Sequence, residues 1–383
     1  MELKKLRLLG SGFTEEEYEL YNLRQKSTEQ CLQYLSLDFT SRIFKPIANS
    51  SHQSFFLEDK WASHHFFKSL GIPVPYTYGL YHPHYGVDHS GEKFNTPEDI
   101  EKLLKQTGPS DIILKPRGGI QGRNIISVNL DYFNNHVNVN SGYEQIAFDN
   151  FISRLSINSF QEYKNSYQGW IIQETVNQHE RLAVFNPSSL NTVRIVTFVN
   201  ASDDCEVHCA LLRMGRKGKT TDNWSQGGIA SHIDIGTGIA GPGFLKPTFG
   251  TGLYSKHPDT NATIKGEIIP FWQSTLDLCR RAALALPGAR SVGWDVGITS
   301  KGPILIEGNA DWGMIMMQIH NEGYLNMKRR QAFSLLGAEF PDRLPSAAES
   351  IIRLYKRGYG TAFRKKLFGR FLKKPMQAFQ NIP

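Results

Sequence analysis

The stretch SVGWDVGITSKGPILIEGNADWGM, residues 291–314, decides the fold class because two alternating runs of residues flank a short turn. In the first run Gly293, Asp295 and Gly297 share one face, and large apolar residues occupy the other face. The second run repeats this division between apolar and polar positions. The stretch therefore predicts a β-hairpin that carries acidic groups on one face.

The turn of this hairpin sets which residues lie opposite each other. A three-residue turn that ends at Gly302, with this glycine in the left-handed conformation, would place Asp295 directly opposite Glu307. Simple alternation then puts Leu305 on the face of Glu307 and Ile306 on the opposite face.

The facing carboxylates of Asp295 and Glu307 repel each other across the strand pair, so the arrangement calls for a cation. The side-chain oxygen of Asn309 adds a third ligand on the same face. An all-oxygen set suits Mg²⁺ with a bound phosphate better than it suits zinc. The alternative is the polar outer face of an ordinary edge hairpin, and the spacing alone is compatible with both.

Composition limits the class of protein. The chain has 383 residues, enough for two or three domains, with 43 Lys and Arg against 36 Asp and Glu. Nine of the basic residues and no acidic residue follow residue 350, so the rest of the chain is nearly neutral. This distribution argues against nucleic-acid binding by a broad basic surface.

Four cysteines are too few for a disulfide scaffold of this size, which favours a reducing compartment. Cys205 and Cys209 could bind a metal, but their flanks alternate like a strand and no second ligand pair follows. Neither a signal peptide nor a stretch of the roughly 18 apolar residues of a membrane span is found. We therefore expect a cytoplasmic protein.

Periodicity and capping residues predict the order of the elements. The clearest helix is TPEDIEKLLKQTG, with Thr96 as N-cap, Pro97 at the first position and Gly108 as C-cap. The other predicted helices cover residues 13–35, 61–70, 142–165, 270–286 and 317–336, and the predicted strands cover residues 73–82, 169–176, 189–200 and 205–215. Residues 111–128 are predicted to form a strand, a glycine-rich turn and another strand.

Lys115 ends an apolar strand, and three glycines follow it at positions 118, 119 and 122. Backbone N–H groups of such a turn can approach a phosphate closely, with the lysine charge beside them. A plain hairpin would have the same pattern, because no Walker A sequence follows. Lys60, at the start of a helix, indicates by itself only a surface residue.

Arg194 lies in the apolar strand NTVRIVTF, where a buried guanidinium needs either a carboxylate or a phosphate as its partner. The later loop NWSQGGIA contains Asn223, Gly227 and Gly228. This loop could form a tight turn or a backbone-lined substrate site.

Taken in this order, the predicted strands, glycine-rich turn and hairpin resemble those of the ATP-grasp superfamily over about residues 55–325. The stretches QETVNQHERLAVFNPSSLNTVRIVTF, NWSQGGIASHID and GWDVGITSKGPILIEGNADWG are similar to its sugar-transfer-associated branch, which is related to α-L-glutamate ligases. The resemblance implies an α+β fold in which two subdomains clamp ATP. It divides the chain into a helical segment (1–55), a subdomain with the glycine-rich loop (56–170), a subdomain with the Mg²⁺ hairpin (171–345) and a basic amphipathic tail (346–383).

The resemblance also implies roles for individual residues. In such proteins two lysines and a glycine-rich loop bind the ATP phosphates, a hinge strand receives the adenine, an acidic residue holds the ribose, an arginine stabilises the transferring phosphoryl group and a hairpin holds two Mg²⁺ ions. The matching residues are Lys60, Lys115, Gly118, Gly119 and Gly122 for the phosphates, Gln173, Glu174 and Val176 for adenine, Glu180 for ribose with His179 as its rival, Arg194 with Lys115 for catalysis, Asp295, Glu307 and Asn309 for Mg²⁺, and Asn223, Gly227 and Gly228 for substrate.

The implied reaction is the joining of a carboxylate and an amine through an acyl phosphate, on small-molecule, saccharide or peptide substrates of cell-surface polysaccharide synthesis. A sugar kinase and a non-catalytic nucleotide-binding scaffold are the alternatives. Fewer than about 60 residues precede Lys60, too few for the N-terminal α/β domain of many such ligases. The tail, residues 351–383, could contact an anionic membrane surface at the periphery or pack as a solvated helix.

Overall fold

The computed structural model describes residues 2–118, 124–131, 136–139, 144–147, 150–151 and 168–359. The chain forms two compact units, one of Met1–Ile47 with Gly313–Pro383 and the other of Ala48–Trp312. The four-part division expected from the sequence stays a prediction. The mixed helices and antiparallel sheets confirm the predicted α+β class.

The first unit is helical and joins the two ends of the chain. Helix α1 packs against α14 so closely that a Cβ on Gly10 would lie 2.5 Å from the side chain of Ser350. Its helices are α1 (Leu3–Gly10), α2 (Glu15–Leu20), α3 (Thr28–Cys31), α4 (Leu37–Phe39), α5 (Lys45–Ala48), α12 (Met314–Gln318), α13 (Met327–Ser334) and α14 (Ala347–Leu354), with π-helical turns at Thr40–Phe44 and Tyr355–Tyr359.

Two of the helices predicted for this unit are wrong, because each is divided into two shorter helices. Residues 13–35 form α2 and α3, because Thr14 and Ser27 each cap a separate helix and Asn22 has a positive φ of 50°. Residues 317–336 are likewise divided, and α13 begins anew at its N-cap Asn326. The capping side chains compete with a continuous helix for the same backbone N–H groups.

The first sheet of the Ala48–Trp312 unit is antiparallel and is covered by α8 (Pro97–Thr107). Thr96, Pro97 and Gly108 bound α8 as predicted, with Gly108 at φ 64°. The strand order is β2 (Val87–Asp88), β1 (Thr77–Tyr81), β7 (Trp170–Glu174), β3 (Asp111–Pro116), β4 (Ile126–Asp131), β5 (His136–Val139) and β6 (Glu144–Ala147). Since β6 is a strand, the helix predicted over 142–165 is wrong there, and most of its other residues lie outside the described ranges.

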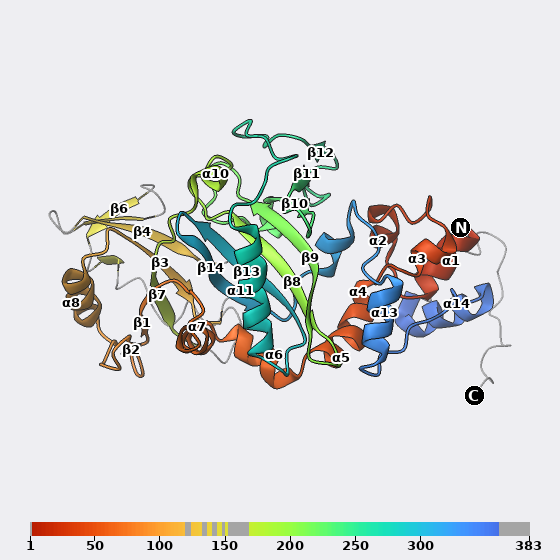
Figure 1. Cartoon of the computed structure of the whole chain (residues 1–383), viewed down its shortest axis with the longest axis horizontal. Helices are drawn as coiled ribbons and strands as arrows, with labels where there is room; N and C mark the ends of the chain where they lie inside the picture. Colours follow the sequence, from red (N-terminus) through yellow and green to blue (C-terminus); the bar gives the residue numbers. More distant parts are fainter. Residues whose placement is uncertain are drawn as a thin grey trace. The chain divides into compact units, whose positions relative to one another are not determined.

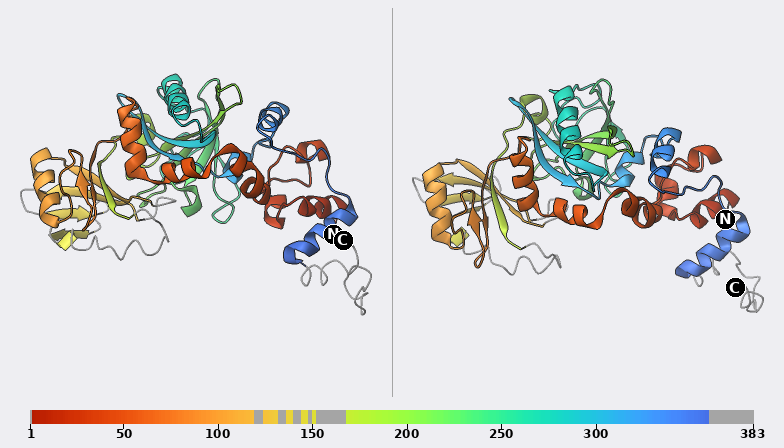
Figure 2. Two further views of the ribbon diagram at one scale, coloured as in Figure 1. Left: turned by 90° about the horizontal axis from the view of Figure 1, so that it is seen from below. Right: turned by 60° about the horizontal axis from the view of Figure 1, so that its bottom comes forward.

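The second sheet holds the main core of this unit. Its strands are β12 (Leu253–Tyr254), β11 (Ala240–Phe244), β10 (Ile229–Ile233), β9 (Cys205–Met214), β8 (Thr192–Val199), β13 (Ser291–Thr299) and β14 (Gly302–Asn309), in this spatial order. Helix α11 (Trp272–Leu284) lies across one face of β8 and β13, and α6 (Ser51–Glu58) and α7 (Lys60–Ser69) contact β14 (Figures 1 and 2). Trp294 and Leu305 are fully buried in this core, so one face of the hairpin is apolar as expected.

The predicted hairpin is present with the predicted Asp295–Glu307 pair, but a shorter turn and a bulge produce this register. The connection between Thr299 and Gly302 has two residues instead of three, and Gly302 has φ 123°. A bulge at Ile306 shifts the register by one residue, so Asp295 pairs with Glu307 as predicted. The same bulge reverses the predicted faces of two residues. Leu305 pairs with Val296 in the core, and Ile306 lines the cleft described below.

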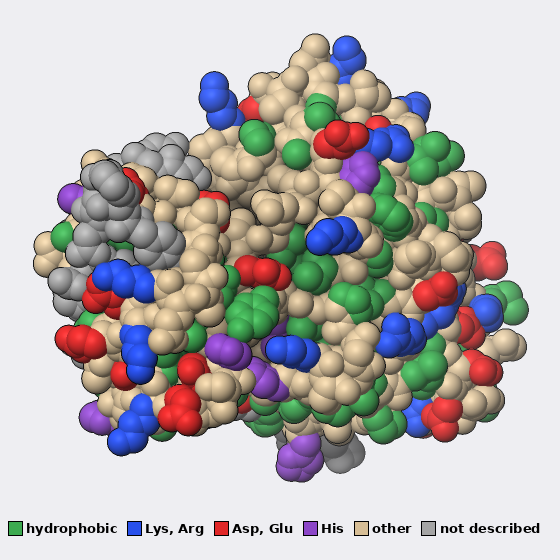
Figure 3. Space-filling view, turned by 60° about the vertical axis from the view of Figure 1, so that its left-hand side comes forward, with side chains coloured by type: hydrophobic (Ala, Val, Ile, Leu, Met, Phe, Trp, Pro, Cys, Tyr) green, Lys and Arg blue, Asp and Glu red, His purple; other side chains and the backbone are tan. Residues whose placement is uncertain are grey.

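Charge on the surface is mixed: Lys, Arg, Asp and Glu side chains are interspersed over the face in Figure 3. Within the described residues, every helix is too short or too polar to pass through a bilayer. Residues 360–383 lie outside the described ranges, so the membrane contact of the basic tail stays a prediction.

Candidate functional site

A cleft of about 540 Å³ in the Ala48–Trp312 unit is lined by residues from both sheets, from α7 and from loops 175–190 and 220–223. Half of the residues predicted for the site line it. They are Lys60, Lys115, Gln173, Glu174, Val176, Asn223, Asp295 and Glu307. The fold thus brings together lysines, a hinge strand and carboxylates that are up to 247 positions apart in the sequence.

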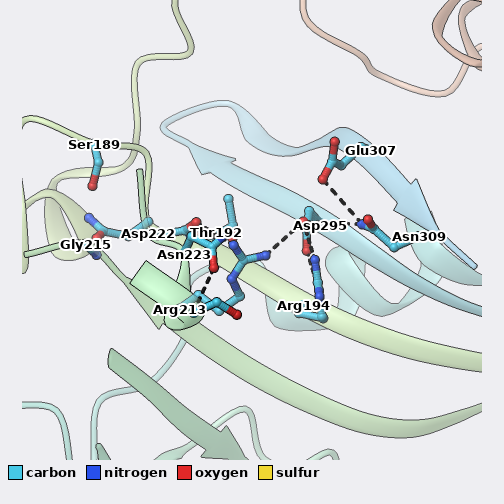
Figure 4. Close-up of polar contacts among 12 residues, drawn as sticks. Ser189, Thr192, Arg194, Arg213, Gly215, Asp222, Asn223, Asp295, Glu307 and Asn309 are labelled. Carbon is cyan, nitrogen blue, oxygen red and sulfur yellow. Dashed lines mark hydrogen bonds and ion pairs between the residues drawn. The ribbon is translucent and has the colours of Figure 1, made fainter. Parts of the chain in front are cut away.

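Asp295 is the centre of a buried ion network (Figure 4). Arg194 lies opposite it on β8 and donates from Nε to Oδ1 at 2.7 Å and from Nη2 to Oδ2 at 2.6 Å. Arg213 on β9 donates from Nη1 to Oδ2 at 2.9 Å. The buried partner that the sequence requires for Arg194 is therefore a carboxylate. Arg194 itself is not among the residues that line the cleft, so its predicted contact with the phosphoryl group stays a prediction.

Arg213 and Asp222 line the cleft and were not predicted from the sequence. Arg213 donates from Nη2 to Oδ1 of Asp222 at 2.7 Å, and Oδ2 of Asp222 accepts the backbone N–H and the hydroxyl of Thr192. The signal for Arg213 was available: like Arg194, it is a charged residue in an apolar run, here residues 209–214 of β9. Asp222 offered no comparable signal, because acidic residues are common in loops.

The pKa values in this network differ because the carboxylates have different numbers of partners. Burial acts to raise the pKa of Asp295, but Arg194 and Arg213 outweigh it and lower this pKa to about 2. Burial raises the pKa of Asp222, and its single guanidinium partner, Arg213, only partly offsets this effect. Burial alone would lower the pKa of Arg213, but Asp222 and Asp295 raise it. Arg213 is therefore a permanent cation in the cleft.

The lysines lie near the second carboxylate of the hairpin. Nζ of Lys60 is 3.7 Å from Oε2 of Glu307. Helix α7 begins at Lys60 because Asp59 caps it, and the carboxylate of Asp59 also forms a bidentate ion pair with Arg117. This pair ties the start of α7 to the end of β3, where Lys115 lies.

Lys115 is only 6% exposed. Burial lowers its pKa to about 8, with Lys60 adding to the effect and Glu307 opposing it. The side of the cleft near these lysines thus carries positive charge that suits an anion.

The hinge strand is connected to the hairpin through one histidine. His64 on α7 donates from Nε2 to the carbonyl of the bulged residue Ile306 at 2.7 Å. Its Nδ1 accepts a hydrogen bond from Nε2 of Gln173 at 2.8 Å, and Gln173 also donates to the hydroxyl of Thr77. The backbone N–H and the side chain of Glu174 bond to the backbone of Tyr76. These bonds hold the hinge residues in place beside the cleft.

The hairpin fits a hard metal ion. Oδ1 of Asp295 accepts one hydrogen bond, from Arg194, so one of its two lone pairs remains for a cation. The side chain of Glu307 is 29% exposed, and its contacts with Nζ of Lys60 at 3.7 Å and with Nδ2 of Asn309 at 3.4 Å are long. Rotating the Asn309 amide by 180° would turn its oxygen toward both carboxylates. Within the described ranges no three His, Cys, Asp or Glu side chains form a cluster, so phosphate or water oxygens would complete the set.

The other predicted residues lie elsewhere. Glu180 is exposed at the start of α10 (Glu180–Ala183) and does not line the cleft, so its ribose role stays a prediction. Gly227 and Gly228 end a short 3₁₀ helix (Trp224–Gln226), with Gly227 at φ 95°. A Cβ on Gly228 would lie 2.5 Å from the carbonyl oxygen of Asp222, so the turn alone explains this glycine.

Three further site predictions in this region stay predictions. Asn223 lines the cleft, but its side chain caps the 3₁₀ helix through the N–H of Ser225. Gly118 does not line the cleft. Gly119 and Gly122 lie outside the described residues, so the glycine-rich loop stays a prediction.

The chain is similar to one known protein family and to several solved structures. A model of the family described as "Sugar-transfer associated ATP-grasp" matches residues 40–332. The chain is similar to three solved structures: carboxyaminoimidazole ribonucleotide synthase from Aspergillus clavatus complexed with ATP (12% identity, 77% of this chain and 56% of that chain, TM-score 0.40), biotin carboxylase from Campylobacter jejuni (13%, 74% and 50%, TM-score 0.41) and L-amino acid ligase from Bacillus licheniformis (10%, 75% and 51%, TM-score 0.37). The chain thus covers 50% to 56% of the length of these proteins.

A search among curated proteins finds no match. The family match nevertheless covers well over half of the chain and includes both sheets and the entire cleft. The chain therefore belongs to the sugar-transfer associated ATP-grasp family and has the ATP-grasp fold.

Proposed function

We propose that the chain is an ATP- and Mg²⁺-dependent ligase that joins a carboxylate to an amine. The observation that carries this proposal is the convergence of three cations, Lys60, Lys115 and Arg213, with the facing carboxylates Asp295 and Glu307 in one cleft. Phosphoryl transfer requires mainly positioning and charge neutralisation, and this set of side chains provides both.

ATP would bind with its adenine against the hinge and its phosphates toward the lysines. The hinge strand β7 ends at Glu174, and Gln173, Glu174 and Val176 line the cleft there. Ile113 of β3 adds an apolar wall beside them. Lys115 also lines the cleft from β3 and is close enough to both Glu307 and Lys60 for their charges to affect its pKa. A triphosphate would offset the cost of burying the lysine charge.

Asp295, Glu307 and Asn309 would hold Mg²⁺, and the number of ions is part of the proposal. The bound metal neutralises charge on the phosphates and orients the γ-phosphate. The arginines keep Asp295 ionised at every physiological pH, because its pKa is about 2. The hairpin can therefore present a charged oxygen to a metal without first losing a proton.

In the first step a substrate carboxylate oxygen would form a bond to the γ-phosphorus, and the bond to the β,γ-bridging oxygen would break. The products are an acyl phosphate and ADP. In the second step an amine nitrogen would bond to the acyl carbon, phosphate would leave with the acyl C–O electrons, and the nitrogen would give up a proton to solvent. Arg213 can donate to the phosphoryl oxygens in both steps, since it lines the cleft.

The acceptor would bind beside the two loops, residues 187–190 and 220–223, that line the cleft and follow the hinge strand in the sequence. There the cleft is lined by residues with hydroxyl side chains, which are Ser188, Ser189, Thr220 and Thr221. Hydroxyl groups of this kind can bond to a saccharide or peptide substrate. The family description supports a place in sugar transfer, such as the synthesis of a cell-surface polysaccharide.

The test is a screen for ADP release by the full-length protein with Mg²⁺ and ATP, in which amino acids, uronic acids and short peptides are supplied singly and in pairs. We expect sustained release only when a carboxylate and an amine are present together, and a product whose mass is their sum less one water. The Glu307→Gln variant is the control and should release no ADP. A product from one substrate that gains only a phosphate would show a kinase instead. Nucleotide binding without turnover across the whole screen would show a scaffold.

A further inference from the structure

We propose that Asp222 is a positioning residue that holds the guanidinium group of Arg213 in the orientation needed to contact the γ-phosphate. This inference rests on the proposed function, because it takes the cleft to be the ATP site. It adds a residue with no role in the sequence prediction, directly before the loop for which the sequence predicted either a tight turn or a substrate site.

Both oxygens of Asp222 are used within the protein. Oδ2 accepts the backbone N–H of Thr192 at 3.0 Å and also the hydroxyl of Thr192, and Oδ1 accepts Nη2 of Arg213 at 2.7 Å. Asp222 is 7% exposed, and its partner Thr192 is the first residue of β8. These bonds use three of the four lone pairs of the carboxylate, and the charged group among its partners is Arg213, so its function is to orient Arg213.

Arg213 is held at two points. Nη2 bonds to Asp222, and Nη1 bonds to Asp295 at 2.9 Å, so the planar group cannot rotate without losing a charge-assisted bond (Figure 4). Its Nε is buried and has no hydrogen-bond partner among the residues that the structure describes. Nη1 and Nη2 each have a second hydrogen that these bonds do not use, and these hydrogens can donate to an anion in the cleft.

The loop that carries Asp222 is itself anchored. Nδ2 of Asn186 donates to the carbonyls of Arg216 and Lys219, each at 3.2 Å. Asp259 forms a bidentate ion pair with Arg216 and accepts the backbone N–H of Lys217. These contacts anchor residues 216–219, whereas Asp222 is held in place by its own bonds to Thr192.

A positioning role and a simple charge effect predict opposite results for Asp222→Asn. Removing a negative charge beside the phosphates should strengthen the binding of a triphosphate if charge alone matters. Releasing Arg213 from one of its two anchors should weaken this binding if orientation matters. The asparagine also places an N–H group toward the N–H of Thr192 or toward Arg213, so it cannot reproduce both sets of bonds.

The experiment measures the affinities of the full-length protein for ADP and for the β,γ-imido analogue of ATP, each with Mg²⁺, by titration calorimetry. For Asp222→Asn we expect about tenfold weaker binding of the triphosphate analogue and less than about twofold change for ADP. The matched control is Asp259→Asn, which removes another carboxylate from an arginine pair of the same loop but outside the cleft. This control should change both affinities by less than about twofold.

The outcomes separate the two proposals. Unchanged or tighter binding of the triphosphate analogue to Asp222→Asn, or an equal loss in Asp259→Asn, would overturn the positioning role and leave the ligase proposal intact. A wild-type protein that binds neither nucleotide would refute the proposed function itself. If Asp222→Asn does not fold, Thr192→Val supplies the test, because it removes only the hydroxyl donor to Asp222. We expect it to weaken analogue binding about threefold while ADP binding stays constant.

Discussion

Replacing Asp295 with asparagine should destabilise the nucleotide-free protein strongly, in addition to any effect on metal binding. Asp295 accepts three hydrogen bonds from Arg194 and Arg213 and is 4% exposed. The lowering of its pKa from 3.8 to about 2 corresponds to roughly 2 kcal/mol in favour of the charged form. Removing one partner of a buried ion pair typically costs ~3–5 kcal/mol, because the remaining charge is left uncompensated. Since asparagine keeps one acceptor oxygen, we expect a loss of about 3 kcal/mol.

Glu307→Gln is the natural comparison because both residues face each other on the hairpin and are predicted to bind the same metal. Glu307 is 29% exposed, and its ion pair with Lys60 has a separation of 3.7 Å. Such partly exposed pairs contribute about 0–1 kcal/mol. Both variants should therefore lose Mg²⁺-dependent nucleotide turnover, but only Asp295→Asn should be much less stable.

The assay is urea unfolding of the wild-type protein and both variants at pH 7 without nucleotide or Mg²⁺, followed by circular dichroism. A difference of about 2 kcal/mol or more between the variants is expected. If Asp295→Asn is as stable as Glu307→Gln, the arginines do not depend on Asp295, and the reasoning about the buried network is refuted. Turnover retained in Glu307→Gln would separately refute the metal assignment.

Three further changes test other parts of the structure. Asp259→Asn should lower the free energy of unfolding by about 1 kcal/mol at pH 7. Because the bonds to Arg216 lower the pKa of Asp259 to about 2, this difference from wild type should disappear between about pH 4 and about pH 2, as measured by urea unfolding. Lys115→Met should raise the free energy of unfolding in urea without nucleotide by about 1–3 kcal/mol, because it removes a buried charge, and should weaken ATP binding at least tenfold in calorimetry. Gly308→Ala should lower the melting temperature by several degrees in calorimetric scans, since the new Cβ would lie 2.7 Å from the ring of Trp294, and an unchanged temperature would contradict the close packing there.

Local patterns in the sequence were sufficient for several features of this protein. Alternation along residues 291–309 predicted the hairpin and its Asp295–Glu307 pair, and the capping residues of α8 predicted both ends of that helix. The same reasoning failed where capping residues lay inside a longer helical pattern, as in residues 13–35. Each success depends on neighbours a few positions away, where backbone geometry and side-chain type are directly linked.

The residues that make up the ion network around Asp295 could not be predicted from local sequence patterns, because they come together only through the pairing of distant strands. Arg194, Arg213 and Asp222 lie on β8, on β9 and in a loop, and they approach Asp295 only because β8 pairs with β13 and β9 pairs with β8. The bulge at Ile306 likewise depends on its partner strand and on the hydrogen bond from His64. Alternation states which face a side chain takes, whereas the register between distant strands is set by the packing of the whole core. The position of each charge beside Asp295 is therefore a property of the folded chain, in which a one-residue shift of register would turn these side chains away from the cleft.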